Sequence, residues 1–152
     1  MIVRLLLFLF LNFGALAMGS FFTRPGVASE WYVQLDKAPW TPPGWIFGAA
    51  WTIIMISFSF YMALAYEKVK NRKLLLSLFA FQFVLNILWN PVFFYFQRTA
   101  LALILIVSLW VIVQQLMFRF QRVVEKWKWL VLPYYIWLLI AISLNTYIVF
   151  QN

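Results

Sequence analysis

The stretch WYVQLDKAPWTPPGW, residues 31–45, separates two long apolar runs and contains three tryptophans and three prolines. A solvated loop has no need of so many aromatic side chains, and each proline stiffens the chain by fixing φ. Pro42 and Pro43 also suit the first turn of a following helix. We therefore expect a rigid connector that folds over one end of a helical bundle as a lid and closes a pocket against water. The alternative is a loop in the headgroup region, with its tryptophans at the membrane interface.

The composition places most of the chain in lipid. Of the 152 residues, 66% are hydrophobic and 11% are charged, too few polar side chains to cover a soluble protein. A crossing of the hydrocarbon layer takes about 20 apolar residues, and backbone groups inside lipid must be paired within the chain. The short later connectors predict that helices two to five pack as consecutive antiparallel neighbours. The sequence thus predicts an all-α, single-domain integral membrane bundle (1–152) of five transmembrane helices, with spans 2–22, 43–66, 74–97, 99–120 and 130–150.

The first span has a second interpretation. MIVRLLLFLFLNFGALAMGS, residues 1–20, has one basic residue, an apolar core and the small-residue stretch Ala15-Leu16-Ala17. This pattern also fits a cleaved signal peptide. Because the apolar stretch is long for a signal peptide and Asn12 interrupts it, we favour a retained helix.

The basic residues are divided unequally between the two sides of the predicted bundle. One side has nine, namely Arg4, Lys68, Lys70, Arg72, Lys73, Arg119, Arg122, Lys126 and Lys128. The other has three, namely Arg24, Lys37 and Arg98. The positive-inside rule then predicts a cytoplasmic N-terminus, with the 31–45 connector and the C-terminus on the opposite side. Topology therefore accounts for the net charge of +8, and we expect no nucleic-acid partner.

The ionisable residues exclude several classes of function. The chain has no His and no Cys, so we expect no metal site of those ligands. No span has an ionisable residue at mid-depth, which argues against proton-coupled carriers, voltage sensors and charged-solute channels. It also argues against hydrolysis, because the bundle has no paired carboxylates and no nucleophile–base set. All four acids lie in connectors or at helix ends, namely Glu30, Asp36, Glu67 and Glu125.

The spans instead contain amides and aromatic rings at helical spacing. Asn86 and Asn90 are four residues apart, as are Trp89 and Phe93 on an adjacent face. On the last span one face is shared by Trp137, Ala141, Leu144 and Asn145. The simple interpretation is that Asn86 and Asn145 form hydrogen bonds between helices.

Prolines and tryptophans give further local predictions. Asn90-Pro91 predicts a kink, and Pro133 predicts another near the start of the last span. Tryptophans near span ends are typical interface anchors. Trp51 and Trp137 lie about two turns inside their spans, deeper than the headgroups, so they either line a cavity or pack against lipid or the core.

Three ordered motifs resemble one known family. WYVQLDKAPWTPPGWIFGAAWT (31–52), LNILWNPVFFYF (85–96) and LPYYIWLLIAISLN (132–145) are similar to the signatures of the translocator protein / tryptophan-rich sensory protein family (TspO/MBR), also called peripheral-type benzodiazepine receptors. The chain departs from that pattern in two places. The Lys-Pro pair is separated in Lys37-Ala38-Pro39, and Tyr147 is followed by no basic residue, so the sterol-recognition pattern of animal members is incomplete.

The resemblance implies a ligand site under the first connector. Members of that family are five-helix membrane proteins, commonly homodimers, that bind porphyrins and other flat apolar ligands. Carried over position by position, the pocket comprises Trp31, Tyr32, Pro42, Trp51, Asn86, Trp89, Phe93, Trp137, Ala141 and Leu144. Indole rings suit the face of a tetrapyrrole. The lack of His and Cys favours a metal-free porphyrin, held as a ligand and not as a cofactor, with Lys37 or Arg24 meeting a propionate at the rim.

The resemblance leaves three functions open. The first is a sensory receptor for tetrapyrroles with a stress or tetrapyrrole-regulatory role, in a bacterial cell-envelope membrane. The second is light- and oxygen-dependent porphyrin degradation, in which Trp51 and Trp137 match the indoles proposed to take part. The third is transport of porphyrin or lipid. We favour a binding protein over an enzyme, because the bundle has no acid–base set.

Overall fold

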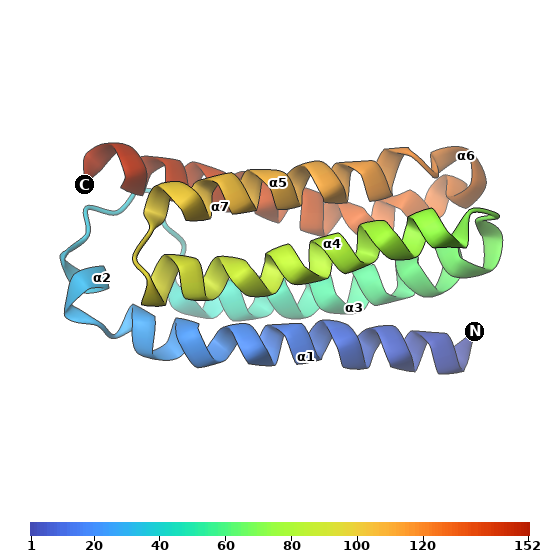
Figure 1. Ribbon diagram of the computed structural model, residues 1–152, viewed down its shortest axis with the longest axis horizontal. Coiled ribbons are helices and arrows are strands. Elements are labelled where there is room, and N and C mark those ends of the chain that lie inside the picture. The colour runs from blue at the N-terminus through green and yellow to red at the C-terminus, as the bar shows by residue number, and fades with distance from the viewer.

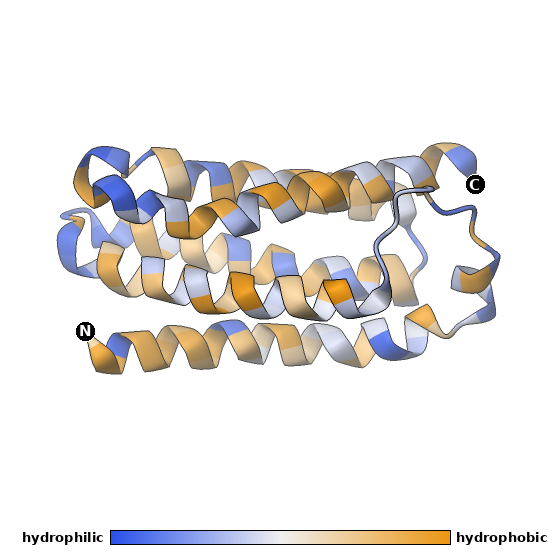
Figure 2. Ribbon diagram, turned by 180° about the vertical axis from the view of Figure 1, so that it is seen from behind, coloured by the Kyte–Doolittle hydropathy of each residue, from blue (hydrophilic) through white to orange (hydrophobic).

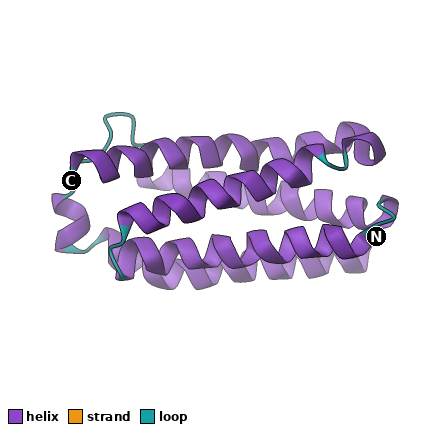
Figure 3. Cartoon of the chain, turned by 45° about the horizontal axis from the view of Figure 1, so that its top comes forward, coloured by secondary structure: helices purple, strands orange, loops and turns teal.

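Five long helices run side by side in the computed structural model, which describes residues 1–152 and contains no strand (Figures 1 and 3). All five are long and apolar enough to cross a membrane, which confirms the predicted all-α bundle. The elements are α1 (Ile2–Val27), α2 (Glu30–Gln34), α3 (Gly44–Lys68), α4 (Arg72–Asn90), the π-helix η1 (Pro91–Tyr95), α5 (Thr99–Phe118), α6 (Gln121–Val124), the 3-10 helix η2 (Glu125–Val131) and α7 (Leu132–Gln151).

The long helices pack as a ring that does not follow chain order. α1 packs against both α3 and α4, α4 against α5, α5 against α7, and α7 closes the ring on α3. The expectation that helices two to five pack as consecutive neighbours is therefore wrong for one pair. α3 and α4 touch only weakly, because α1 packs against both of them.

Several helix ends differ from the predicted spans. α1 continues to Val27, five residues past the predicted end, and contains Pro25 in its last turn. α4 begins two residues early at Arg72, since Asn71 caps it by accepting a bond from Leu74 N at 3.0 Å. Pro133 lies in the first turn of α7, a position that tolerates proline, so the predicted second kink is wrong.

The break at Asn90-Pro91 is confirmed, and it takes the form of a π-helix. α4 ends at Asn90 and η1 begins at Pro91, whose ring removes a backbone donor. The wider turn closes with Phe96 N donating to Pro91 O at 2.9 Å. Gln97, at φ 54°, then reverses the chain into α5. Extra residues in a π turn rotate the side chains that follow, and this places the rings of η1.

The 28–43 connector covers the end of the ring where the C-terminus lies, at the left of Figure 1. It contains the short helix α2 and an extended segment that is fastened to α7. Asp36 N donates to Asn152 Oδ1 at 2.8 Å, and Asn152 Nδ2 donates back to Asp36 O at 3.1 Å. Trp40 Nε1 donates to Ser143 Oγ at 3.1 Å. We call this connector the lid and this end of the bundle the lid end.

The opposite half of the ring, toward the N-terminus, is filled by large buried side chains. Phe58 is stacked on Phe79 with ring centroids 6.1 Å apart and meets Tyr134 edge-on at 5.4 Å. Two buried phenols there have partners, since Tyr134 OH donates to Gln82 Oε1 at 3.1 Å and Tyr61 OH donates to Leu116 O, whereas the buried Nε1 of Trp110 on α5 has none. Figure 2 shows the apolar residues along the helices and the polar ones gathered toward the two ends, as a membrane-spanning bundle requires.

Candidate functional site

Aromatic rings from the lid lie directly on rings from α4 and η1. Trp31 meets Phe93 edge-on at 5.7 Å, and Tyr32 meets Phe94 at 5.6 Å. Trp89 is stacked on Phe93 at 5.0 Å with planes 17° apart. These five residues, which we call the lid cluster, form a satellite apolar group at the end of the main core. Four of them were predicted for the site, and the structure brings those four together.

The local sequence explains how the lid rings are held. Ser29 caps α2 by accepting a hydrogen bond from Tyr32 N at 3.3 Å, while its hydroxyl donates to Gly26 O at 2.6 Å. The lid therefore turns sharply after α1, and α2 carries Trp31 and Tyr32 onto η1. Burial raises the pKa of the Tyr32 phenol above its ordinary value.

Lys37 belongs to the lid itself. Its Nζ donates to Val33 O and to Leu35 O, both at 3.2 Å, and lies 4.8 Å from the ring centroid of Tyr32. The ammonium group is thus used to fix the turn after α2. Of the two cations suggested for a ligand carboxylate, Arg24 is the one without an acidic or hydrogen-bonded partner.

Two asparagines beneath the lid cluster have different environments. Asn145 Oδ1 accepts a bond from Trp89 Nε1 at 3.2 Å, and its Nδ2 donates to Thr99 O at 3.0 Å, so it forms the predicted link between helices. Asn86 is 9% exposed, and its side-chain amide forms no hydrogen bond to another helix. The interpretation of Asn86 as a link between helices is therefore wrong. Its amide therefore has unused hydrogen-bonding capacity for a polar group on a ligand.

The remaining aromatic site residues lie between α3 and α7. Trp137 meets Phe47 edge-on at 5.3 Å, and half-buried Trp51 meets Tyr134 at 5.8 Å. The two predicted indoles therefore each pack on a different partner. The other predicted residues on these elements are half-buried, namely Pro42, Ala141 and Leu144.

Sequence reasoning missed two aromatic members of the site, Phe47 and Phe94. A signal was available, because Phe47 and Trp51 are four residues apart, as are Asn90 and Phe94, so each shares a helical face with a residue already singled out. The π turn at Pro91 was not predictable, and it decides that Phe93 and Phe94 both point inward.

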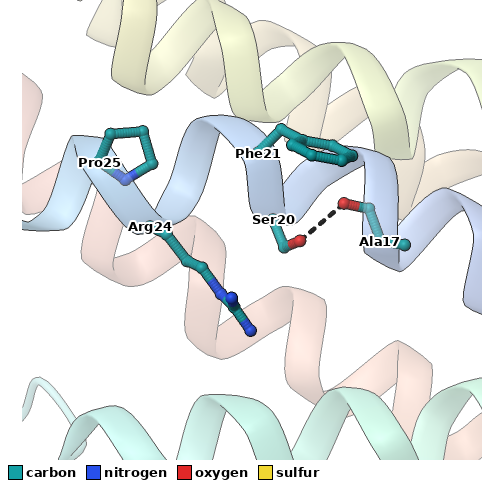
Figure 4. A pocket seen from close by; sticks show the side chains of 5 residues that line it. All are labelled: Ala17, Ser20, Phe21, Arg24 and Pro25. Atoms are coloured by element: carbon teal, nitrogen blue, oxygen red, sulfur yellow. Dashed lines mark hydrogen bonds between the residues drawn. The ribbon is translucent and has the colours of Figure 1, made fainter.

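A hollow of about 340 Å³ lies on α1 near the lid end, lined by Ala17, Ser20, Phe21, Arg24 and Pro25 (Figure 4). Ser20 Oγ donates to Ala17 O at 2.7 Å, which occupies its proton within the helix. Arg24 is exposed and extends from α1 along this hollow. None of the ten predicted pocket residues lines it.

Two glycines of α1 let side chains of α4 and η1 pack closely against its backbone in the lid half of the ring. A Cβ on Gly26 would meet Phe94 at 2.4 Å, and one on Gly19 would meet Asn90 Nδ2 at 2.6 Å. Asn90 Oδ1 also accepts a bond from Thr23 Oγ1 at 2.8 Å. Gly19 and Gly26 therefore serve close contact of α1 with α4 and η1.

Comparison with known proteins identifies the family. The sequence profile described as the TspO/MBR family matches residues 6–151, which include all five long helices and the lid. The chain belongs to the TspO/MBR family. The match confirms the resemblance seen in the three motifs and, with the five apolar helices, establishes an integral membrane protein.

Relatives in the TspO/MBR family come from bacteria and animals. The tryptophan-rich sensory protein of Cereibacter sphaeroides is 38% identical over 120 residues, which cover 76% of this chain and 73% of that protein. The tryptophan-rich protein TspO of Chlorobaculum tepidum is 38% identical over 134 residues, covering 84% and 82%. The translocator protein of Bos taurus is 28% identical over 132 residues, covering 84% and 78%.

Proposed function

We propose that this TspO/MBR protein is a sensory receptor that binds protoporphyrin IX-like tetrapyrroles between the lid and the ring of helices. The observation that carries the proposal is the lid cluster, in which Trp31 and Tyr32 cover the stacked rings of Trp89 and Phe93. Offset stacking on such rings suits a broad π system, and each aromatic pair contributes about 0.5–1.5 kcal/mol beyond area burial.

The residues around the cluster supply the other contacts of the proposed site. The amide of Asn86 offers a polar handle for a pyrrole nitrogen or a carboxylate, because it has no partner within the protein. The apolar wall of the proposed site consists of Trp51 on α3, of Trp137, Ala141 and Leu144 on α7, and of Pro42 in the lid. Exposed Arg24 at the lid end is available to a propionate. Entry requires the lid to move, which breaks the contacts of Trp31 and Tyr32 with η1.

Titration of the purified protein with protoporphyrin IX in the dark, followed by tryptophan quenching, tests this proposal. We expect saturable quenching that weakens in Asn86→Leu and is unchanged in Trp45→Phe, because Trp45 is 73% exposed on the first turn of α3. Quenching that is linear in porphyrin, or equal in both variants, would mean partition into detergent and would end the proposal.

Photo-oxidative degradation is the second candidate, favoured by half-buried Trp51 in edge contact with buried Tyr134. Illumination of the same samples under oxygen distinguishes the two. A stable porphyrin absorption band supports a receptor, whereas a band that decays in the native chain and persists in Trp51→Phe or Trp137→Phe supports degradation. Saturable porphyrin flux into sealed vesicles would instead indicate transport.

We further propose a homodimer in a bacterial cell-envelope membrane with a cytoplasmic N-terminus. The charge distribution supports the orientation. Because the chain has no cysteine, a single cysteine introduced by Lys70→Cys or Thr41→Cys is the only thiol that can be labelled. Its labelling therefore reports the orientation of the chain. Labelling of intact cells with an impermeant maleimide should modify only Thr41→Cys, and the reverse pattern would contradict the orientation. Light scattering of the detergent complex gives the oligomeric mass.

A further inference from the structure

The two ends of the bundle differ strongly in charge. The end with the N-terminus has nine lysines and arginines against two acids, Glu67 and Glu125, a formal charge of +7. The lid end has three against two, a charge of +1, and together these make the +8 of the chain. An excess of this size attracts anions in general, so the positions of the individual cations decide whether there is a site.

Part of this positive charge is neutralised within the protein. Arg4 Nη1 lies 2.8 Å from Glu67 Oε1, which also lies 3.1 Å from the N-terminal ammonium group. Arg4 and Arg72 both lie over the ring of Tyr66, at 5.2 and 4.9 Å, and Arg72 Nε donates to Tyr66 O at 3.1 Å. These groups hold α1, α3 and the start of α4 together, so they are not available to a ligand.

In the connection between α5 and α7, by contrast, the lysines are not neutralised by acids of the protein. The stretch from Arg122 to Trp129 along α6 and η2, which we call the basic–aromatic segment, contains three basic residues and one acid, Glu125, and basic and aromatic side chains alternate over its last four positions, 126–129. Lys126 Nζ lies 5.3 Å from the ring centroid of Trp127, and Lys128 Nζ lies 5.1 Å from that of Trp129. Neither lysine has an acidic partner. The only other polar contact of Lys128 is the neutral Gln121 Oε1 at 3.5 Å.

The apolar side chains of this segment are also exposed. Trp129 is 56% exposed and Val123 is 43% exposed, although Val124 and Val131 anchor the segment in the core. The segment joins two membrane-spanning helices, so its indoles lie at the level of the lipid headgroups, where tryptophan is most stable. Cations held on indole rings at that level face the phosphates of the lipid.

We propose that the basic–aromatic segment is a binding site for an anionic phospholipid. Lys126 and Lys128 pair with the negatively charged headgroup, and Trp127 and Trp129 rest against the glycerol and the first methylenes of the acyl chains. This site is at the end of the bundle opposite the lid, so it is independent of the tetrapyrrole proposal. Because its cations are unpaired, it should prefer net-negative phosphatidylglycerol over phosphatidylcholine, which has the same phosphate but no net charge.

Native mass spectrometry of the full chain in a neutral detergent tests the site without porphyrin, because each bound lipid is resolved. For the first bound lipid we expect phosphatidylglycerol to bind at least about fivefold more tightly than phosphatidylcholine, as about one basic residue near a headgroup provides. The double variant Lys126→Gln/Lys128→Gln should lose most of that preference, and Lys126→Arg/Lys128→Arg should retain it.

Two control variants, each of which also removes two positive charges, distinguish direct binding at the segment from attraction of the lipid by the overall charge of the protein. Lys68→Gln/Lys70→Gln removes two exposed lysines from the same end, and Lys37→Gln/Arg98→Gln removes two cations from the lid end. Both should leave the preference within about twofold of the native chain if Lys126 and Lys128 act through direct pairing, because salt weakens the effect of exposed charges that do not touch the headgroup. An equal loss in Lys68→Gln/Lys70→Gln would overturn the proposal in favour of diffuse charge. Equal affinity of the native chain for both lipids would also overturn it and would leave the segment to an acidic protein partner.

Discussion

The two halves of the ring interior both contain many aromatic residues, but these are fully buried in one half and only partly buried in the other. Toward the N-terminus, Phe58, Tyr61 and Tyr134 are fully buried and the phenols donate to Leu116 O and Gln82. Toward the lid, Trp31, Tyr32 and Trp89 are only half-buried, and the Asn86 amide has no partner. The first half is closed by fully buried rings, and the second is closed only by a lid that packs on it. Aromatic content alone therefore does not mark a ligand site, whereas incomplete burial of the rings does.

The strongest test of this comparison truncates the closed half. Phe58→Ala removes a ring that packs against Tyr61, Phe79 and Tyr134. We expect a loss of about 3–5 kcal/mol in the free energy of unfolding, as for other buried aromatic truncations. Denaturation in detergent micelles measures it. Phe150→Ala is the control, because Phe150 is 78% exposed, and a similar loss there would contradict the assignment of the core.

A smaller loss is expected at the joint between α1 and the lid half. Gly26→Ala would place a Cβ 2.4 Å from Phe94, so the ring must shift, at a cost of about 1–3 kcal/mol. Gly14→Ala in the same helix meets nothing within 4 Å, and there we expect a gain of about 0.5–1 kcal/mol. Thermal unfolding of both variants should give shifts of opposite sign, and equal shifts would show that α1 does not pack as described.

The lid half should respond in binding more than in stability. Trp31→Ala removes an edge contact with Phe93 and one face of the proposed ligand site. We expect about tenfold weaker binding of protoporphyrin IX, equivalent to about 1.4 kcal/mol. Fluorescence titration beside Trp45→Ala gives the comparison. If the affinity for protoporphyrin IX is unchanged and the free energy of unfolding falls strongly, Trp31 belongs to the core. The two halves would then not differ in function.

The smallest effect is expected for the polar contact in the closed half. Gln82→Met leaves the buried hydroxyl of Tyr134 without its acceptor while it keeps the side-chain volume. Hydrogen bonds between membrane helices contribute about 0.6 kcal/mol on average and at most about 1.7 kcal/mol, so we expect a loss in that range. Unfolding in detergent measures it, with Gln151→Met, on an exposed residue, as the control. A gain in stability would indicate that the hydrogen bond between Tyr134 and Gln82 specifies how the helices pack and does not stabilise the fold.

Local features of this protein were well predicted where one residue dominates a short segment. Asn90-Pro91 marks the end of α4, as predicted, whereas the expectation that Pro42 or Pro43 lies in the first turn of α3 is wrong, because Pro43 is the N-cap and the helix begins at Gly44. Trp31, Tyr32, Trp89 and Phe93 were assigned to one site, and the structure brings them together. The role of Asn86 was not predictable, since an amide on a buried face is compatible with a bonded or a free state. Pro133 was misread because the exact start of α7 decides whether proline kinks a helix or begins it.

The sequence by itself determined that the chain crosses the membrane five times as helices, because hydrocarbon allows no unpaired backbone and long apolar runs satisfy that requirement locally. It also determined which end carries the positive charge. Only the tertiary structure decided that α1 lies between α3 and α4, that a π turn directs Phe93 and Phe94 inward, and that Asn145 is bonded while Asn86 is not. These outcomes depend on contacts between helices, through close approach at Gly19 and Gly26 and through side-chain fit, and neither is encoded in the hydropathy of a single segment.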